Sequence, residues 1–433
     1  MDMVFTHTSN EYNMLYRAEP YYRYYFRTNG ASWQNVGTGN WIDDDKTNKP
    51  FAYKMVVDSA LYWIKEFHID GIRFDLVVGT REETLKEIQK KLCNPNGSGV
   101  CQSYTDSLGN TIKPPNFLTG ENWLGATRHS FMVQSGTNDT LGSTGIDFTA
   151  QVTGDYPGFS QWNDYFRESV KAFVQGNSDP MYTSRTKTAM YFSKNRDDGI
   201  WQAISKNPVD TLNYIESHDE ETIFHAVLGN EFKAALGMLT LLVSHGIPMI
   251  QQGQEFFRDK GKQDQSYSGN VIKWGGLSSN KKMFYLTKYL IDMRKSCAAF
   301  QYAADPTVTN SNFDSSTVNQ TYSFFTKGTA CSGSSTTQLN GRTEFRVLAN
   351  MTNTTQTFTV ETGGSRWCAF VHIADADGTE SSPQANFSVI SPPSNSGLTD
   401  IASWGYTTST WALNAYSAVI LSKISATGTC SSP

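Results

Sequence analysis

The chain has 433 residues, and 36 Lys and Arg residues against 41 Asp and Glu residues give a formal net charge of -5. This length predicts about two or three domains rather than one small domain. The charge balance lacks the basic surface that nucleic acid binding requires, so no nucleic acid partner is expected. Aromatic residues reach 13% and charged residues only 18%, which favours a secreted or carbohydrate-binding protein because apolar sugar faces pack on aromatic rings.

Apolar strands alternate with helical patterns through roughly the first 295 residues. The expected elements are a strand at 3–5, a helix after Pro50, a strand at 71–76, a helix spanning 85–92, a strand ending at 117–121, a helix at 162–174, a strand at 211–215, a helix at 231–243, a strand at 248–251 and a helix at 282–295. Repeated β-α alternation implies a parallel sheet, either a barrel or a doubly wound fold.

The longest uncharged apolar stretch covers residues 234–250. Ser244, His245, Gly246 and Pro248 interrupt it before it reaches the length that a membrane span requires. The stretch therefore predicts a buried helix followed by a strand, and no membrane partner is expected.

The composition changes at about residue 305, after which Ser, Thr and Asn are frequent and Lys and Arg are rare. Alternating runs predict strands at 322–325, 356–360 and 416–421. This pattern indicates a separate antiparallel β-sandwich. The expected domains are a β/α domain at 1–300 and a C-terminal β-sandwich at 301–433.

The six cysteines are Cys93, Cys101, Cys297, Cys331, Cys368 and Cys430. None forms a C-x-x-C pair, so the sequence does not indicate a zinc site. Cys93 and Cys101 flank a short loop that a disulfide could close. The even count fits an oxidising compartment, although buried free thiols are the alternative.

Three predicted strand ends each present an acid: Asp75, Glu121 and Asp219. In a β/α barrel the active site lies at such strand ends. Hydrolysis of a glycosidic bond needs two carboxyl groups, one that attacks the anomeric carbon and one that protonates the leaving oxygen, about 5–5.5 Å apart in retaining enzymes. The three acids therefore suggest this chemistry.

Each acid has an informative neighbour. Arg73 lies two positions before Asp75, so both side chains point to the same face of one strand, where the arginine can keep the carboxylate ionised. Glu121 lies close to Trp123, an apolar setting that suits a general acid, and His218 precedes the third acid. Taken singly, such pairs are more often a structural ion pair, a loop cap or a turn, so the hypothesis depends on their joint occurrence.

Four short segments stand out: Asp-Met-Val-Phe-Thr-His at 2–7, Gly-Ile-Arg-Phe-Asp at 71–75, Gly-Glu-Asn-Trp at 120–123 and Asn-Tyr-Ile-Glu-Ser-His-Asp at 213–219. Together they resemble the characteristic regions of the α-amylase superfamily of glycoside hydrolases, family thirteen. With the segments at 253–260 and 265–268, they look like pullulanase-type debranching enzymes. The resemblance covers about residues 1–295 and, more loosely, the C-terminal part.

The resemblance implies a role for each matching residue. Asp75 is the nucleophile that forms a β-glycosyl-enzyme, while Glu121 protonates the bridging oxygen and then activates water. Asp219 binds sugar hydroxyls and favours the distorted transition state. The implied supporting residues are Arg73 beside Asp75, His7 and His218 on the sugar before the cleaved bond, and Trp123 as a stacking platform after it.

In this family the segment that contains His7 is the third strand of a (β/α)8 TIM-type barrel. The expected fold is therefore such a barrel with its first two βα units missing, followed by the C-terminal sandwich. Thr6 stands where the family has asparagine, which is a calcium ligand in calcium-binding members. Threonine is a poorer ligand, so neither calcium nor another cofactor is expected.

The expected activity is retaining hydrolysis of α-1,6 branch linkages in pullulan-, starch- or glycogen-like α-glucans, by a monomer. Two alternatives stay open: an α-1,4-acting amylase or glucanotransferase of the same superfamily, and a non-catalytic glucan-binding remnant. Asn122 and Glu220 replace a proline and an asparagine of the family on the leaving-group side. No signal peptide opens the chain, yet the cysteines and low charge favour a secreted or periplasmic protein.

Overall fold

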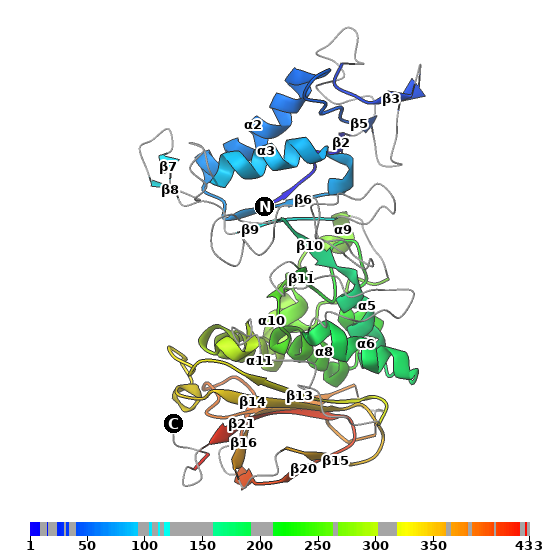
Figure 1. Ribbon diagram of the computed structural model, residues 1–433. Helices are drawn as coiled ribbons and strands as arrows, with labels where there is room; N and C mark the ends of the chain where they lie inside the picture. Colours follow the sequence, from blue (N-terminus) through cyan, green and yellow to red (C-terminus); the bar gives the residue numbers. More distant parts are fainter. Residues whose placement is uncertain are drawn as a thin grey trace. The chain divides into compact units, whose positions relative to one another are not determined.

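The computed structural model in Figure 1 divides into two compact units, Met1–Trp162 with Asp197–Leu212, and Asn163–Arg196 with Asn213–Pro433. Within them the structure describes residues 1–8, 15, 24–29, 32–33, 40–93, 104–105, 111–112, 117–121, 159–191, 211–262, 267–301, 318–360, 365–379, 383–401, 404–424 and 429–430. In these ranges no helix combines the length and apolar character needed to cross a membrane.

Short parallel strands form the sheet of the first unit. They are β1 (Asp2–Met3), β6 (Gly71–Phe74), β9 (Phe117–Gly120) and β10 (Phe159–Asn163), which ends at the boundary of the unit. Each strand pairs in parallel with the next, with Met3 opposite Phe74 and Phe74 opposite Gly120. The predicted parallel pairing is therefore confirmed for these strands.

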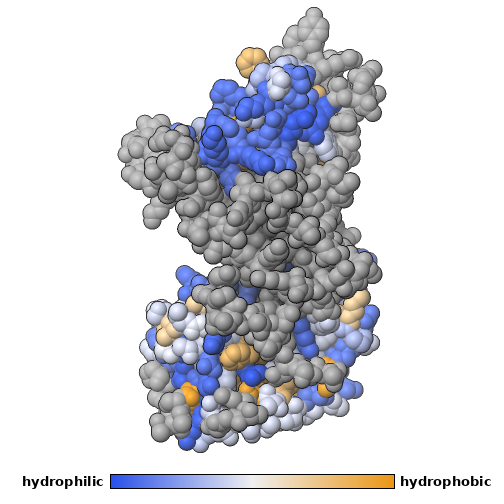
Figure 2. Space-filling model, in the orientation of Figure 1, coloured by the Kyte–Doolittle hydropathy of each residue, from blue (hydrophilic) through white to orange (hydrophobic). Residues whose placement is uncertain are grey.

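Two helices cover this sheet and pack against each other. They are α2 (Pro50–Phe67) and α3 (Glu82–Cys93). Pro50 suits the first turn of α2, where its missing N–H leaves no hydrogen bond unmade. Ile64 and Ile88, one from each helix, are fully buried together with Ile72 of β6. The opposite side of α3 carries Glu and Lys residues and forms a hydrophilic surface in Figure 2, as an amphipathic helix requires.

Smaller elements surround this core. They are β2 (His7–Thr8) paired with β5 (Asn40–Trp41), β3 (Thr28–Asn29) with β4 (Ser32–Trp33), β7 (Tyr104–Thr105) with β8 (Thr111–Ile112), and the 3-10 turn η1 (Val77–Gly79). Arg27 ties these pieces together because Nη2 donates to Asp44 Oδ1 at 3.0 Å and to the Gly79 carbonyl at 2.7 Å.

The second unit begins with a helical part. Its elements are α5 (Asp164–Val174), α6 (Pro180–Tyr191), β11 (Thr211–Asn213, shared with the first unit), α7 (Ile223–Ala226), α8 (Glu231–Val243), β12 (Ile247–Pro248), η4 (Gln254–Phe256), α9 (Tyr267–Asn270), α10 (Gly275–Ser279), α11 (Lys281–Ser296) and η5 (Ala298–Phe300). Asn230 caps α8 by accepting from Lys233 N, and every residue from Phe232 to Val243 is buried. The apolar stretch is thus a buried helix followed by a strand, as predicted.

Arg294 of α11 closes the C-terminal end of α8. Its Nη1 donates to the carbonyls of Leu242 at 2.9 Å and Ser244 at 2.6 Å and also to Phe300, while Nη2 donates to the Gly246 carbonyl. The last carbonyls of a helix have no partner within the helix. Burial lowers the pKa of Arg294 to about 10, so the side chain stays charged at neutral pH and serves as a buried cap.

The C-terminal β part of the second unit is mainly antiparallel. The large sheet runs β13 (Thr321–Lys327), β14 (Glu344–Asn350), β21 (Ser417–Ile424), β16 (Arg366–Asp375), β17 (Ala385–Val389) and β18 (Thr399–Asp400), with β19 (Tyr406–Thr407) beside β16; the small sheet is β15 (Gln356–Thr359) with β20 (Thr410–Leu413). Phe358 and Leu413 of the small sheet are buried. The strands predicted at 322–325, 356–360 and 416–421 are confirmed, and the boundary at 300/301 stays a prediction.

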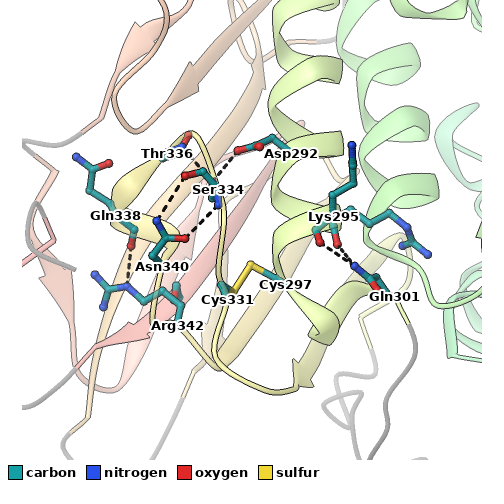
Figure 3. The surroundings of a disulfide bond; sticks show 12 residues. Asp292, Lys295, Cys297, Gln301, Cys331, Ser334, Thr336, Gln338, Asn340 and Arg342 are labelled. Atoms are coloured by element: carbon teal, nitrogen blue, oxygen red, sulfur yellow. Dashed lines mark hydrogen bonds between the residues drawn. A yellow bond between two sulfur atoms is a disulfide. The ribbon is translucent and has the colours of Figure 1, made fainter.

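Two disulfides strengthen this part of the chain. Cys297 bonds to Cys331, and Cys368 bonds to Cys430. Figure 3 shows the first of them, where Asp292 on α11 accepts a 2.6 Å hydrogen bond from Ser334 Oγ in the segment that follows Cys331. The end of α11 is therefore fixed to the β part. The predicted Cys93–Cys101 pair lies outside the described residues because Cys101 is not among them.

Candidate active site

Arg73 on β6 lies at the centre of a cluster of carboxylates in the first unit. Its Nη1 contacts Asp75 Oδ1 at 2.6 Å and Asp2 Oδ1 at 2.8 Å, and its Nη2 pairs with Glu121 Oε1. The guanidinium also lies over the ring of Trp162, 4.5 Å from its centroid. The predicted contact between Arg73 and Asp75 is present, and the same arginine also contacts Glu121, which the sequence pattern did not indicate.

The charge of Arg73 is stabilised in spite of its burial. Burial by itself lowers the pKa of Arg73, but the carboxylates of Glu121, Asp2 and Asp75 outweigh this effect and raise the pKa. A planar guanidinium can hold two carboxylates at once through separate nitrogens, which a lysine cannot do in the same geometry. Arg73 therefore fixes the orientation of Asp75 and Glu121 relative to each other.

Strand register explains why these two acids meet. Phe74 of β6 lies opposite Gly120 of β9, so Asp75 and Glu121 directly follow paired residues at the carboxyl ends of neighbouring parallel strands. The Glu121 N–H donates to the Phe74 carbonyl at 3.3 Å, which extends the ladder by one step. The carboxyl ends of parallel strands are where β/α proteins place their active sites.

The side chain of Glu121 is held from a second direction. It is only 4% exposed, and Leu76 N donates to its Oε2 at 3.1 Å. The preceding Gly120 leaves no room for a side chain, because a Cβ there would lie 2.8 Å from Val77. The Gly-Glu pair therefore allows β9 to pass close to the turn after Asp75 and to direct a buried carboxylate at it.

Thr6 supports the backbone around Asp75. It is buried, and its Oγ1 donates to the carbonyls of Asp75 at 2.7 Å and Leu76 at 3.1 Å. The hydroxyl therefore anchors the carbonyls of Asp75 and Leu76 from the neighbouring strand segment. In the described ranges no group of three or more His, Cys, Asp or Glu residues could hold a metal ion.

His7 lies on β2, opposite Trp41 of β5. Its partial burial lowers the pKa of His7, while the negative charge of Asp75 acts in the opposite direction. Nδ1 has no hydrogen-bond partner among the residues that the structure describes. Burial is the larger of these two effects on the pKa of His7.

His218 and Asp219 form the corresponding pair in the second unit. The buried residues Tyr214 to Ser217 follow β11, and the two polar side chains then emerge with 44% and 34% of their surface exposed. His218 Nε2 lies 3.3 Å from Asp219 Oδ1, and Asp219 N donates to Ser217 Oγ at 3.3 Å. Both side chains are accessible to a ligand. Trp123, the predicted stacking platform, lies outside the described residues.

Glu216 is a buried acid that the sequence reading did not single out. It is 1% exposed, and its Oε2 accepts a 2.6 Å hydrogen bond from Ile223 N, which closes the loop that carries His218 and Asp219. Burial raises the pKa of Glu216 to about 8, against the opposing effects of Ile223 N and of nearby cations that include Arg258. Glu216 is therefore largely protonated at neutral pH.

This shift predicts a pH-dependent stability. Between pH 4.5 and about 8 the folded protein keeps a proton on Glu216 that the unfolded chain releases, so the free energy of unfolding falls as the pH rises through this window. Glu216→Gln removes the ionisable group. The free energy of unfolding of this variant, relative to that of the wild type, should therefore be roughly 2–3 kcal/mol higher at pH 8.5 than at pH 5. This expected change is smaller than the pKa shift of Glu216 converted at about 1.4 kcal/mol per unit. The reason is that the surroundings relax around the ionised carboxylate.

Urea unfolding at pH 5 and pH 8.5 measures this difference. Glu66→Gln, which changes an exposed carboxylate on α2, controls for the loss of charge alone. An equal effect of Glu216→Gln at the two pH values would show that Glu216 does not titrate in this window.

A cavity of about 530 Å³ lies in the second unit near this loop. Its lining includes Phe256, Arg258, Lys260, Lys273 and Asn280. These residues come from the segment at 253–260, which the sequence marked as similar to debranching enzymes, and from the elements that follow it. The lining combines an aromatic face with cationic and amide donors, a composition that suits a polar ligand.

Comparison with curated proteins finds related sequences. The chain is 25% identical over 321 residues to the pullulanase of Bacillus subtilis (strain 168), a match that covers 70% of this chain and 40% of that protein. It is 23% identical over 360 residues to isoamylase 1, chloroplastic, of Oryza sativa subsp. japonica, covering 71% and 42%. The chain therefore spans less than half the length of these relatives. No family model matches the sequence.

Solved structures share the fold. The pullulanase of Anoxybacillus sp. LM18-11, determined in complex with maltotetraose, superposes with a TM-score of 0.64 at 18% identity, over 98% of this chain and 53% of that one. The chain therefore shares its fold with the corresponding part of that pullulanase. Sequence and structure comparisons agree, and the chain is a homologue of the pullulanases and isoamylases, which confirms the resemblance that its short motifs indicate.

Proposed function

We propose that this chain carries the active site of a retaining glycoside hydrolase that cleaves α-1,6 linkages in α-glucans. The observation that carries the proposal is the joint pairing of Asp75 and Glu121 with Arg73 at the ends of two neighbouring parallel strands. Two carboxyl groups held by one guanidinium match the two-carboxyl requirement of glycoside hydrolysis. The relationship to pullulanases and isoamylases supports the α-1,6 bond as the target.

In this mechanism Asp75 attacks the anomeric carbon while Glu121 gives a proton to the bridging oxygen, so that the glycosidic bond breaks and a glycosyl ester forms on Asp75. Glu121 then takes a proton from water, which attacks the same carbon and releases Asp75. Arg73 orients Asp75 through the 2.6 Å contact. Thr6 fixes the peptide that carries the nucleophile.

The remaining predicted residues bind the sugar. We assign Asp219 to sugar hydroxyls in the transition state, His7 and His218 to the sugar before the cleaved bond, and Trp123 to stacking after it. The exposure of His218 and Asp219 supports this assignment, since both can reach a ligand. The chemistry proceeds with carboxyl groups alone, so we propose no cofactor.

The order of the strands along the chain is compatible with part of a β/α barrel. We infer that β1, β6, β9, β10, β11 and β12, which follow one another along the chain, correspond to the third to eighth strands of a (β/α)8 barrel, with a β-sandwich after them. The complex of a solved homologue with maltotetraose supports an α-glucan substrate. Two disulfides favour an oxidising compartment, and we propose a secreted or periplasmic monomer.

Product analysis tests the function. Purified chain incubated with pullulan is expected to release maltotriose, because pullulan is a chain of maltotriose units joined by α-1,6 bonds. A linear α-1,4-glucan run in parallel distinguishes the amylase or glucanotransferase alternative, which would shorten or redistribute that substrate and leave pullulan without maltotriose release. Binding of both glucans without cleavage of either would contradict hydrolysis and favour the glucan-binding alternative.

A further inference from the structure

We propose that Lys260 is a positioning residue that fixes the segment carrying His218 and Asp219, an inference that rests on the proposed function of that pair. Lys260 is 8% exposed. Its Nζ donates to the Ser217 carbonyl at 3.1 Å and also to the His218 carbonyl. One buried ammonium therefore holds the two consecutive peptides that lead into Asp219.

Asn270 completes this contact. Its Oδ1 accepts from Lys260 Nζ at 3.3 Å, and its Nδ2 donates to the His218 carbonyl at 3.2 Å. The three N–H groups of an ammonium are thereby matched by three acceptors. The His218 carbonyl receives two donors, one of them charged, and charge-assisted hydrogen bonds are about twice as strong as neutral ones. This carbonyl is the best-anchored atom in the peptide between His218 and Asp219.

The fold places Lys260 there through a tight loop after β12. Gly253 has a φ of 102° and lies against Arg258, whose side chain would lie 2.5 Å from a Cβ at that position. Arg258 N donates to the Gly253 carbonyl at 3.0 Å, and Arg258 Nη2 donates to the Gly269 carbonyl at 2.9 Å. Arg258 therefore links the loop that carries Lys260 to the short helix that ends in Asn270.

The same segment is fixed at its far end by Glu216, which accepts from Ile223 N. Between these two anchors lie the two polar side chains that reach solvent. Their positions follow from the backbone, and Lys260 is the charged group that holds this backbone directly. A displacement of about 1 Å in a catalytic group can cost on the order of a hundredfold in rate, so loss of the ammonium should act on turnover.

Kinetics of Lys260→Met and Lys260→Arg on pullulan test the proposal. Lys260→Met keeps much of the apolar stem but cannot donate, and we expect kcat to fall roughly 10- to 100-fold with KM changed by less than about threefold. Lys260→Arg keeps the charge and donors and should recover part of kcat. Lys282→Met is the matched control, because Lys282 also donates to a backbone carbonyl, that of Ala385 at 2.9 Å, in the same unit.

Hydrogen exchange supplies a readout that does not need activity. The amides of residues 217–222 should exchange at least about tenfold faster in Lys260→Met than in the wild type or in Lys282→Met, with other peptides unchanged. Unchanged exchange there, or an equal effect of Lys282→Met, would overturn the positioning role. If Lys260→Met does not fold, Lys260→Gln, which loses the charge but keeps a neutral donor, should still speed exchange at residues 217–222, by a smaller factor than loss of all donors would.

Kinetics and hydrogen exchange together distinguish failure of the proposed function from failure of the positioning role of Lys260. If the wild type cleaves no glucan, the proposed function fails while the exchange experiment still decides whether Lys260 holds the segment. If the wild type is active and exchange responds but kcat does not, the contact is structural only, and the positioning proposal is wrong.

Discussion

Asp75→Asn is expected to lower the rate of pullulan hydrolysis by at least about four orders of magnitude, corresponding to roughly 5–6 kcal/mol in the barrier. An amide cannot form the glycosyl ester, and the substitution also removes one of the carboxylates that pair with Arg73. The change in size is negligible, so the fold should be retained. Maltotriose release under saturating substrate measures the effect, and circular dichroism checks the fold.

A second variant separates the two carboxyl roles. Glu121→Gln cannot protonate a leaving oxygen, but an α-glucosyl fluoride needs little protonation, so this variant should recover much of the rate of the first step on that substrate, seen as a burst of fluoride, while Asp75→Asn should not. Steady-state turnover of Glu121→Gln should stay low, because Glu121 also activates the water of the second step. Asp58→Asn, which alters an exposed acid on α2 paired with Lys54, serves as the control and should keep full activity. Activity of Asp75→Asn above a few per cent of wild type would rule out its role as nucleophile.

Arg294→Met is expected to reduce the free energy of unfolding by about 3–5 kcal/mol. The thioether fills much of the space but leaves the buried carbonyls of Leu242, Ser244, Gly246 and Phe300 without their donor. Hydrogen bonds to charged groups contribute about 1.5–3 kcal/mol each, and orphaned buried acceptors cost comparable amounts. The loss stays below the sum of the four because neighbouring groups relax.

Chemical unfolding followed by tryptophan fluorescence measures this loss, with both disulfides kept oxidised. Lys295→Met removes the adjacent positive charge on the same helix, but Lys295 is exposed, so that variant should change stability by less than about 0.5 kcal/mol. Similar values for the two variants would mean that the contacts of Arg294 add little to stability.

Local sequence patterns predicted those elements whose boundaries are marked by capping or helix-ending residues. The helix expected at 231–243 has these bounds in the structure, because Asn230 caps its start and Ser244 ends the apolar run. The strand β10 was missed. Its Trp162 and Asn163 were read as the first turn of a helix that begins at Asp164. Asn163 caps that helix by accepting from Phe166 N, and an asparagine before an amphipathic run is the signal that could have located the boundary.

The candidate site was predictable only in part. Spacing by two along a strand gives the contact between Arg73 and Asp75, because strand periodicity is local. The pairing of Arg73 with Glu121 depends on the register between β6 and β9. The two residues are nearly fifty positions apart in the sequence. The hold of Lys260 on the His218 carbonyl spans 42 positions. No local pattern encodes either contact.

Cysteine pairing shows the same limit. The even number of cysteines fitted an oxidising compartment, with buried free thiols as the alternative, and six cysteines allow fifteen connectivities. The Cys93–Cys101 pair, suggested by proximity in sequence, stays a prediction. The structure joins Cys297 to Cys331 and Cys368 to Cys430, at separations of 34 and 62 residues. Partners at such distances are chosen by the packing of α11 and the strands, which spacing does not reveal.

The buried cap on α8 also has a consequence for synthesis. The carbonyls of Leu242 and Ser244 precede their donor Arg294 by 52 and 50 positions. At about 5–20 residues per second, a ribosome adds that arginine roughly 3–10 s after it has made the end of α8. During this interval the largely apolar helix α8 lacks the charged donor for its last carbonyls. The second unit can therefore complete its folding only after α11 has emerged from the ribosome.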